Sequence, residues 1–146
     1  MKPGKITMDK IKTEIVEELN RLMAEEAEAF LRYFQLRYRL RGTDRLAAEN
    51  FFDKAMDETL EHAQEIAGKI RSLGQIPKLD IKLSLSGGPI RLQEALAEAL
   101  EFEQQALDAY KEFLPRVTGD TMLEDFIRKQ VAVETEHVQE IASLLE

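Results

Sequence analysis

The chain contains no cysteine among its 146 residues. Disulfides, thiolate zinc sites and iron–sulfur clusters are therefore excluded, and the lack of cysteine is typical of a reducing cytosol. Long apolar runs are also missing: residues 1–10 hold no apolar segment of a signal peptide, and no stretch approaches the length of a membrane span. We therefore expect a cytoplasmic protein without a membrane partner.

Positive charge is scarce. Lysine and arginine together number 20 against 28 aspartates and glutamates, so the net charge is −8. Binding to a phosphate backbone needs a basic face, so we expect no nucleic-acid partner, whereas an acidic surface attracts cations. The length and the 44% share of hydrophobic residues favour one globular domain that spans residues 1–146.

Apolar residues recur with the 3.6-residue period of helices in four segments, which predicts an all-α protein. The first segment covers about residues 8–41, and Gly42 and Thr43 then suit a C′ residue and the N-cap of a second helix that ends near residue 73. The third begins near Pro89 and is ended by Pro115. Thr121 and Glu124 form a capping box that opens the fourth.

The lengths of the connections predict the topology. The turns around residue 42 and at 115–120 are short, so each helix pair should be antiparallel. Residues 74–88 can span the length of a bundle, and the alternating run Ile81-Lys82-Leu83-Ser84-Leu85 is typical of extended chain. We expect an up-down-down-up four-helix bundle with one long crossover, which packs on its own bundle or pairs with a second subunit in a homodimer or larger homo-oligomer.

Histidine is the other scarce residue type, with two in the chain. His137 closes Glu134-x-x-His137 and His62 closes Glu58-x-x-x-His62, and both spacings place the two side chains on one helical face. Alone, such a motif often lies on a solvated face. Here Glu134 and His137 lie on the apolar stripe of their helix, which favours metal ligation by imidazole and carboxylate.

Two further glutamates interrupt apolar stripes. Glu26 lies among Leu22, Met23, Ala29 and Phe30, and Glu103 among Ala99, Leu100, Ala106 and Leu107. A buried carboxylate needs a cation, a proton or a metal, and no basic residue lies on these stripes. Glu101 is the alternative to Glu103, on a face that looks solvated. Tyr33 and Tyr110 follow the two glutamates at equal spacing, so we expect core residues whose hydroxyls bind ligand carboxylates, with a redox role as the alternative.

This pattern resembles the ferritin-like superfamily, in particular its bacterioferritin and rubrerythrin relatives. The resemblance extends from Leu19 to about Leu145. It implies a di-iron site in which Glu58 and Glu134 bridge two metal ions, and it places the other four ligands at Glu26, His62, Glu103 and His137.

Three features depart from those relatives. Thr59 stands where a glutamate three residues before His62 is expected, so Glu58 needs the longer spacing or a π-bulge to reach the site. No methionine follows Glu58 to ligate a haem, so haem is not expected. We expect no short fifth helix of the kind that helps ferritins close their cages, which argues against a closed ferritin cage. The cysteine-bound iron domain of rubrerythrin is not expected either, because the chain has no cysteine.

The resemblance implies a non-haem di-iron oxidase of ferroxidase type, with Fe(II) and O₂ or H₂O₂ as its partners. One alternative is a manganese- or iron-dependent peroxidase or catalase with the same ligands. Another, suggested by Thr59, is a four-helix binding module whose degenerate site is empty or holds zinc. A bundle with no metal at all would have to bury four carboxylates close together, which their mutual repulsion opposes.

Overall fold

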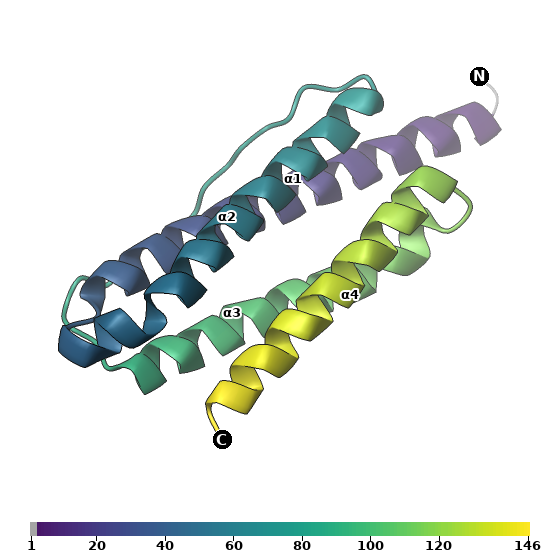
Figure 1. Cartoon of the computed structure of the whole chain (residues 1–146). Helices are drawn as coiled ribbons and strands as arrows, with labels where there is room; N and C mark the ends of the chain where they lie inside the picture. Colours follow the sequence, from purple (N-terminus) through teal and green to yellow (C-terminus); the bar gives the residue numbers. More distant parts are fainter. Residues whose placement is uncertain (1–2) are drawn as a thin grey trace.

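Four α-helices make up the bundle (Figure 1). The computed structural model describes residues 3–146, and their side chains from residue 10 on. The helices are α1 (Pro3–Arg39), α2 (Gly42–Ser72), α3 (Leu92–Phe113) and α4 (Thr121–Leu144), with a 3₁₀ turn, η1 (Leu114–Val117), after α3. The predicted all-α bundle is confirmed, and α1 begins five residues before the expected Met8. We expected no signal peptide in residues 1–10, and the first two of these lie outside the described residues.

The up-down-down-up topology follows from the connections. The short links after α1 and after α3 leave each pair antiparallel, and the crossover from 73 to 91 carries the chain back along the bundle (Figure 1). None of the helices described combines the length and apolar character that a bilayer crossing requires.

The crossover lies along α1 and runs parallel to it. Lys78 donates its backbone N–H to Asn20, Gln35 donates to the carbonyl of Ser86, and Arg39 donates to that of Gly88. An extended chain advances about twice as far per residue as a helix, which explains why eight crossover residues match fifteen residues of α1 between the first two contacts. The expected extended run is therefore present, as irregular chain and not as a strand.

Two apolar clusters form the core, one at each end of the bundle. The first, around Leu19, Ile66 and Ile127, joins the start of α1 to the start of α4. The second, around Leu36, Phe52 and Ile141, joins the other ends. Each fully buried side chain of this size contributes about 1.5–3 kcal/mol. Together the clusters hold the four helices in place around a polar band at mid-bundle.

The start of α2 differs from the prediction. Its N-cap is Arg41, without a side-chain cap, so the expected Thr43 cap is wrong. Gly42 is left-handed, with φ of +58°, but it is the first residue of α2 and not the expected C′ residue, because α1 ends at Arg39. Asp44 in the first turn of α2 accepts the backbone N–H of Leu92 at 3.1 Å and thereby caps α3. A cap from another helix leaves no local sequence signature.

Two further helix starts were predicted incorrectly. The capping box of Thr121 and Glu124 is wrong, because Asp120 caps α4 by accepting the backbone N–H of Leu123 at 3.2 Å. Aspartate is at least as good an N-cap as threonine, and it stands one residue earlier. Helix α3 begins at Leu92 and not near Pro89, because Ile90 is held in a parallel bridge to Leu40.

Candidate metal centre

Two groups of potential ligand atoms share one glutamate between the two apolar clusters. Glu26, His62 and Glu134 form the first group, and Glu103, Glu134 and His137 the second. Within each group the ligand atoms lie within 4.8 Å of one another. Ligand atoms on opposite sides of a transition-metal ion are about 4.2 Å apart, so a small contraction would fit an ion into each group. Every helix contributes, and Glu134 is common to both groups.

The three glutamates of these groups are buried, with exposed fractions of 3% for Glu26, 2% for Glu103 and 1% for Glu134. They are buried because each lies on the stripe that its helix turns toward the core. Glu101, the alternative on α3, is exposed, and so is Glu61 on α2. The preference for Glu103 over Glu101 agrees with this placement.

The two tyrosines bind the glutamates of the opposite helices. Tyr33 on α1 donates its hydroxyl to Glu103 on α3 at 2.7 Å, and Tyr110 on α3 donates to Glu26 on α1 at 2.7 Å. The predicted bonds between tyrosine hydroxyls and these carboxylates are confirmed. The equal distances follow from the repeated Glu-x₆-Tyr spacing, which relates the two halves by a pseudo-twofold axis.

The imidazoles turn their Nδ1 atoms toward the carboxylates. His62 Nδ1 lies 3.5 Å from Glu26 and 3.8 Å from Glu134. His137 Nδ1 lies 3.3 Å from Glu103 and 3.6 Å from Glu134. The two rings face each other with centroids 6.3 Å apart. Both histidines therefore present the same nitrogen to the shared Glu134.

Burial and the closeness of the ligand residues shift their pKa values in opposite directions. Burial, together with the neighbouring Glu103, raises the pKa of Glu134 well above its ordinary value. Burial alone would raise the pKa of Glu103, but its bonds with Glu134, His137 and Tyr33 lower that pKa to about 2. Burial opposes the charging of His137, yet the nearby Glu103 and Glu134 carboxylates raise its pKa to about 11. Without metal, the second group therefore holds its protons on Glu134 and His137.

Some buried polar atoms have no hydrogen-bond partner in the part of the chain that the structure describes. They include Nδ1 of His62 and Oε2 of Glu134, one from α2 and one from α4. A buried polar atom without a partner costs about 1–3 kcal/mol. Both atoms belong to the candidate ligand groups, and nitrogen and carboxylate oxygen are the donors that iron, manganese and zinc accept. The donor set therefore fits a metal ion.

Glu58 belongs to neither ligand group. Its Oε2 lies 2.6 Å from Nε2 of His137, and its other oxygen lies 3.8 Å from Lys54 Nζ. The π-bulge that would turn Glu58 inward is absent, since α2 is α-helical from 42 to 72. Thr59 faces the core instead, and its hydroxyl donates to the carbonyls of Ala55 and Met56. The structure thus brings together five of the six predicted ligands.

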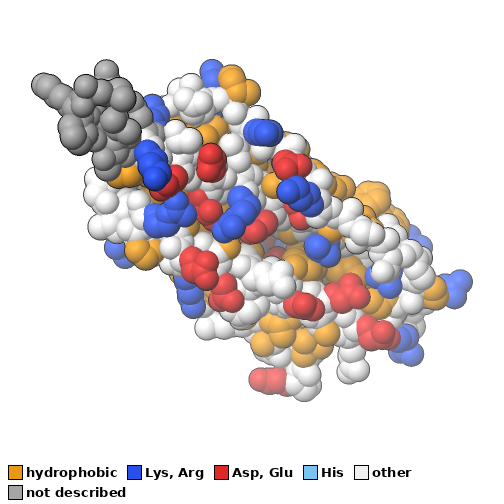
Figure 2. Space-filling view, turned by 180° about the vertical axis from the view of Figure 1, so that it is seen from behind, with side chains coloured by type: hydrophobic (Ala, Val, Ile, Leu, Met, Phe, Trp, Pro, Cys, Tyr) orange, Lys and Arg blue, Asp and Glu red, His pale blue; other side chains and the backbone are white. Residues whose placement is uncertain are grey.

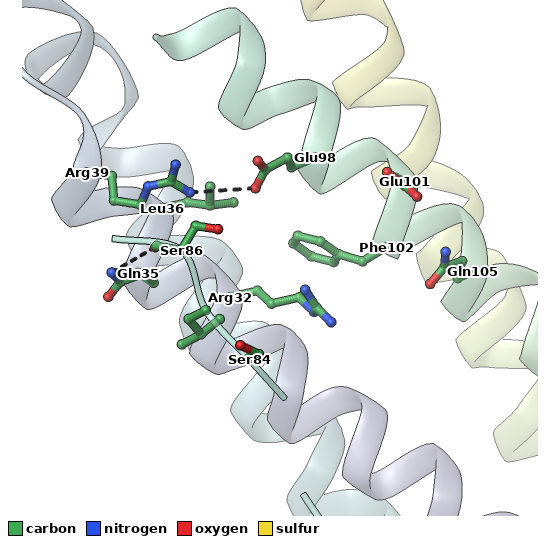
Figure 3. A pocket seen from close by; sticks show the side chains of 11 residues that line it. Arg32, Gln35, Leu36, Arg39, Ser84, Ser86, Glu98, Glu101, Phe102 and Gln105 are labelled. Atoms are coloured by element: carbon green, nitrogen blue, oxygen red, sulfur yellow. Dashed lines mark hydrogen bonds and ion pairs between the residues drawn. The ribbon is translucent and has the colours of Figure 1, made fainter. Parts of the chain in front are cut away.

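Two hollows lie between α1 and α3, on the side of the bundle that Figure 2 shows. The inner hollow, of about 160 Å³, reaches the three buried glutamates and is bordered by Glu25 and Glu28. The outer hollow, of about 340 Å³, extends to the crossover (Figure 3). Arg32 and Phe102 border both, with the guanidinium 6.0 Å from the ring centre. The carboxylates are therefore reached from an acidic surface.

Two residues near the site were not identified from the sequence. Phe102 packs edge-on against Tyr33, with ring centres 4.8 Å apart. Gln130 is 1% exposed, one helical turn before Glu134, and neither end of its amide has a hydrogen-bond partner among the described residues. A sequence signal for Gln130 exists, because it lies three residues after Ile127 on the stripe that carries Glu134.

Residues 16–146 match the family described as Ferritin-like domain. No curated protein sequence matches the chain.

Solved structures share the fold at low sequence identity. A ferritin-like diiron-carboxylate protein from Bacillus anthracis is 24% identical, with a TM-score of 0.83 over 93% of this chain and 98% of that one. A Dps protein from Bacillus brevis is 16% identical, with a TM-score of 0.85 over the full length of both chains. Desulfovibrio desulfuricans bacterioferritin is 18% identical, with a TM-score of 0.79 over 93% and 80% of the two chains.

Identities this low show that the fold is shared and do not transfer an activity. The family match, however, covers all but the first 15 residues of the chain. The chain therefore belongs to the ferritin-like family.

Proposed function

We propose that the chain is a non-haem di-iron protein that binds Fe(II) and oxidises it with O₂ or H₂O₂. The observation that carries the proposal is the pair of buried ligand groups that meet at Glu134. Two solved structures of the same fold are described as a diiron-carboxylate protein and as a bacterioferritin with a diiron site, which supports iron over other metals.

Fe(II) is the substrate in this proposal. Each of two ferrous ions gives up one electron, and H₂O₂ takes up both electrons and two protons to leave two water molecules. O₂ would accept the same two electrons and two protons to become H₂O₂. A peroxidase or catalase would use the same residues, so activity with each oxidant separates these functions.

Five residues of the chain would bind the two metal ions, and two tyrosines orient the carboxylates among them. Glu26 and His62 would hold one ion, Glu103 and His137 the other, and Glu134 both. Tyr33 and Tyr110 keep the Glu103 and Glu26 carboxylates in one orientation by their hydroxyl bonds. The two apolar clusters close the band at both ends of the bundle, and burial of the carboxylates strengthens their electrostatic interactions. A redox role for either tyrosine remains a prediction.

The route to the site supports cation entry. The inner hollow leads from Glu25 and Glu28 at the surface to the buried carboxylates. Burial is the main reason why the pKa of Glu25 is raised, with neighbouring glutamates adding to it and Arg21 opposing it. The two carboxylates at the entrance outnumber the one guanidinium that borders it, Arg32, and an acidic entrance attracts divalent cations.

The first experiment measures metal content per subunit and then Fe(II) oxidation in air by the metal-free protein. We expect two ions per chain and oxidation well above the protein-free rate. The variant Glu134→Gln should lose both, because its side chain belongs to both groups. Glu101→Gln, which alters an exposed glutamate of α3, is the matched control.

The second candidate function is a binding module with a degenerate site, and Thr59 favours it. One zinc ion or none per chain, without Fe(II) oxidation, would support the module and contradict the di-iron proposal.

We further propose that the chain forms a homo-oligomer through α1 and the crossover. Phe34 and Tyr38 on α1 are exposed as a ring pair, and Ile81 and Leu85 are exposed on the crossover beside that helix. Hydrophobic side chains gather along one long edge of the molecule (Figure 2). An exposed apolar stretch of this kind is typical of an interface.

Sedimentation velocity tests the oligomer. Phe34→Glu should lower the sedimentation coefficient to that of a monomer. Met122→Glu, at an exposed position in the first turn of α4, should leave it unchanged. A monomeric wild type would contradict the proposal.

A further inference from the structure

His137 is held from both sides of its ring. Nδ1 faces Glu103 and Glu134, at 3.3 and 3.6 Å, and Nε2 lies 2.6 Å from Glu58. The two nitrogens of an imidazole point away from each other. A carboxylate in contact with Nε2 therefore lies on the opposite side of the ring from the candidate metal position.

Glu58 is also less buried than the residues of the ligand groups. Its side chain is 29% exposed, whereas that of Glu134 is 2% exposed. It borders a small hollow of about 30 Å³ together with Lys54 and His137. A carboxylate that bridges two ions has to lie between the groups, whereas Glu58 contacts the outer nitrogen of His137, and the neighbouring residue that α2 buries is Thr59. Glu58 therefore has the location of a supporting residue.

The contact has a defined chemical effect. A neutral imidazole carries its proton on one nitrogen and offers the lone pair of the other. A carboxylate that accepts a hydrogen bond from Nε2–H fixes the proton there and leaves Nδ1 free to bind a metal ion. The same hydrogen bond makes Nδ1 more basic and therefore a stronger metal ligand. Residues that support a ligand in this way change metal affinity by about 10–100-fold when they are removed.

His62 provides an internal comparison. Its Nδ1 faces Glu26 and Glu134 in the same way, but no hydrogen bond or ion pair joins its Nε2 to a residue in the described part of the chain. The pseudo-twofold axis therefore relates the ligand residues, but the carboxylate that contacts Nε2 of His137 has no counterpart at His62 among the described residues. The two ligand groups should differ in affinity.

We propose that Glu58 is a positioning residue for His137 and not a metal ligand, so that the site has Glu134 as its one shared carboxylate. This inference rests on the proposed function. It predicts that Glu58→Ala still binds two ions per chain but has a roughly 10–100-fold lower affinity for one of them. Glu58→Gln should keep that affinity within about threefold, because its amide oxygen still accepts the Nε2–H bond.

Zinc titration followed by NMR tests the proposal, since Zn²⁺ is diamagnetic. With ¹⁵N-labelled histidine the two imidazoles give four ring-nitrogen signals, one Nδ1 and one Nε2 from each histidine. In the zinc-loaded wild type we expect a slowly exchanging Nε2–H proton on His137. It should persist in Glu58→Gln and disappear in Glu58→Ala. Glu61→Gln changes an exposed glutamate of the same helix and is the matched control.

The outcomes separate the two proposals. If the wild type binds two zinc ions, but Glu58→Ala and Glu58→Gln both bind one, then Glu58 is a ligand and the inference is overturned while the metal site stands. An Nε2–H signal that is unchanged in Glu58→Ala would overturn it as well. If the wild type binds no zinc ion, the proposed metal site itself fails, and the positioning role fails with it.

Discussion

Replacing Glu134 by glutamine should stabilise the metal-free protein. Glu134 is 1% exposed, and its Oε2 has no hydrogen-bond partner among the described residues. Burial and the neighbouring Glu103 raise the pKa of Glu134 well above 4.5. A glutamine has the same shape and carries no charge, so it resembles the protonated carboxyl group. The substitution removes the cost of keeping a proton on this side chain.

The magnitude follows from linkage. A carboxyl group whose pKa is raised by folding binds its proton more tightly in the folded state, so stability falls as pH rises above the unfolded value of 4.5. The loss stops once the pH exceeds the folded pKa. Each pH unit corresponds to about 1.4 kcal/mol, so two and a half units between 4.5 and 7 give at most about 3.5 kcal/mol. Glu134→Gln should recover up to this amount at pH 7 and almost nothing at pH 4.5.

Urea unfolding of chelator-treated protein measures the effect. With an m-value of about 2 kcal/mol/M, a gain of about 3.5 kcal/mol moves the midpoint by about 1.75 M. Saturating metal should reverse the order of stability, because the wild type gains binding free energy through a ligand that the variant lacks. The reasoning is refuted if Glu134→Gln is less stable than the wild type at pH 7 without metal, or if the gain does not depend on pH.

Three further predictions concern the same band of the bundle. Tyr33→Phe and Tyr110→Phe should each lower the unfolding free energy by about 1–3 kcal/mol, because each leaves a buried carboxyl oxygen without its 2.7 Å bond; a loss in urea unfolding of less than about 0.5 kcal/mol would contradict this. Thr59→Glu should add a bridging carboxylate, tighten metal binding in a calorimetric titration and destabilise the metal-free protein by about 1–3 kcal/mol; weaker binding would refute it. Gln130→Met should raise the thermal midpoint of the metal-free protein through a gain of about 1–2 kcal/mol, since it removes an amide without partners; a lower midpoint would show that the amide has a partner.

Much of the fold can be predicted because its causes are local. The 3.6-residue stripe shows which face of a helix is buried, and connection lengths show which helices are antiparallel. Glu26 and Glu103 were identified by the same logic, since a charged residue inside an apolar stripe has to lie in the core. The tyrosine bonds to carboxylates were also predicted, but not that Tyr33 on α1 would bind Glu103 on α3.

Helix ends were predicted less well. The N–H groups of a first helical turn accept any nearby oxygen, and the sequence shows only those within a few residues. Asp120 took the place of Thr121, which is a local competition between adjacent caps. Asp44 capped α3 across 48 residues, and only the docking of α2 against the start of α3 brings the two together.

The sequence by itself determined the helices, their order, and the burial of Glu26, Glu103 and Glu134, because each is a property of one helix and its period. The tertiary structure decided how those groups are combined. Glu134 came to be shared by both ligand groups, and Glu58 came to contact the outer nitrogen of His137, because the separation and rotation of neighbouring helices set these distances. Those quantities depend on how the two apolar clusters pack, and no local pattern of residues contains them.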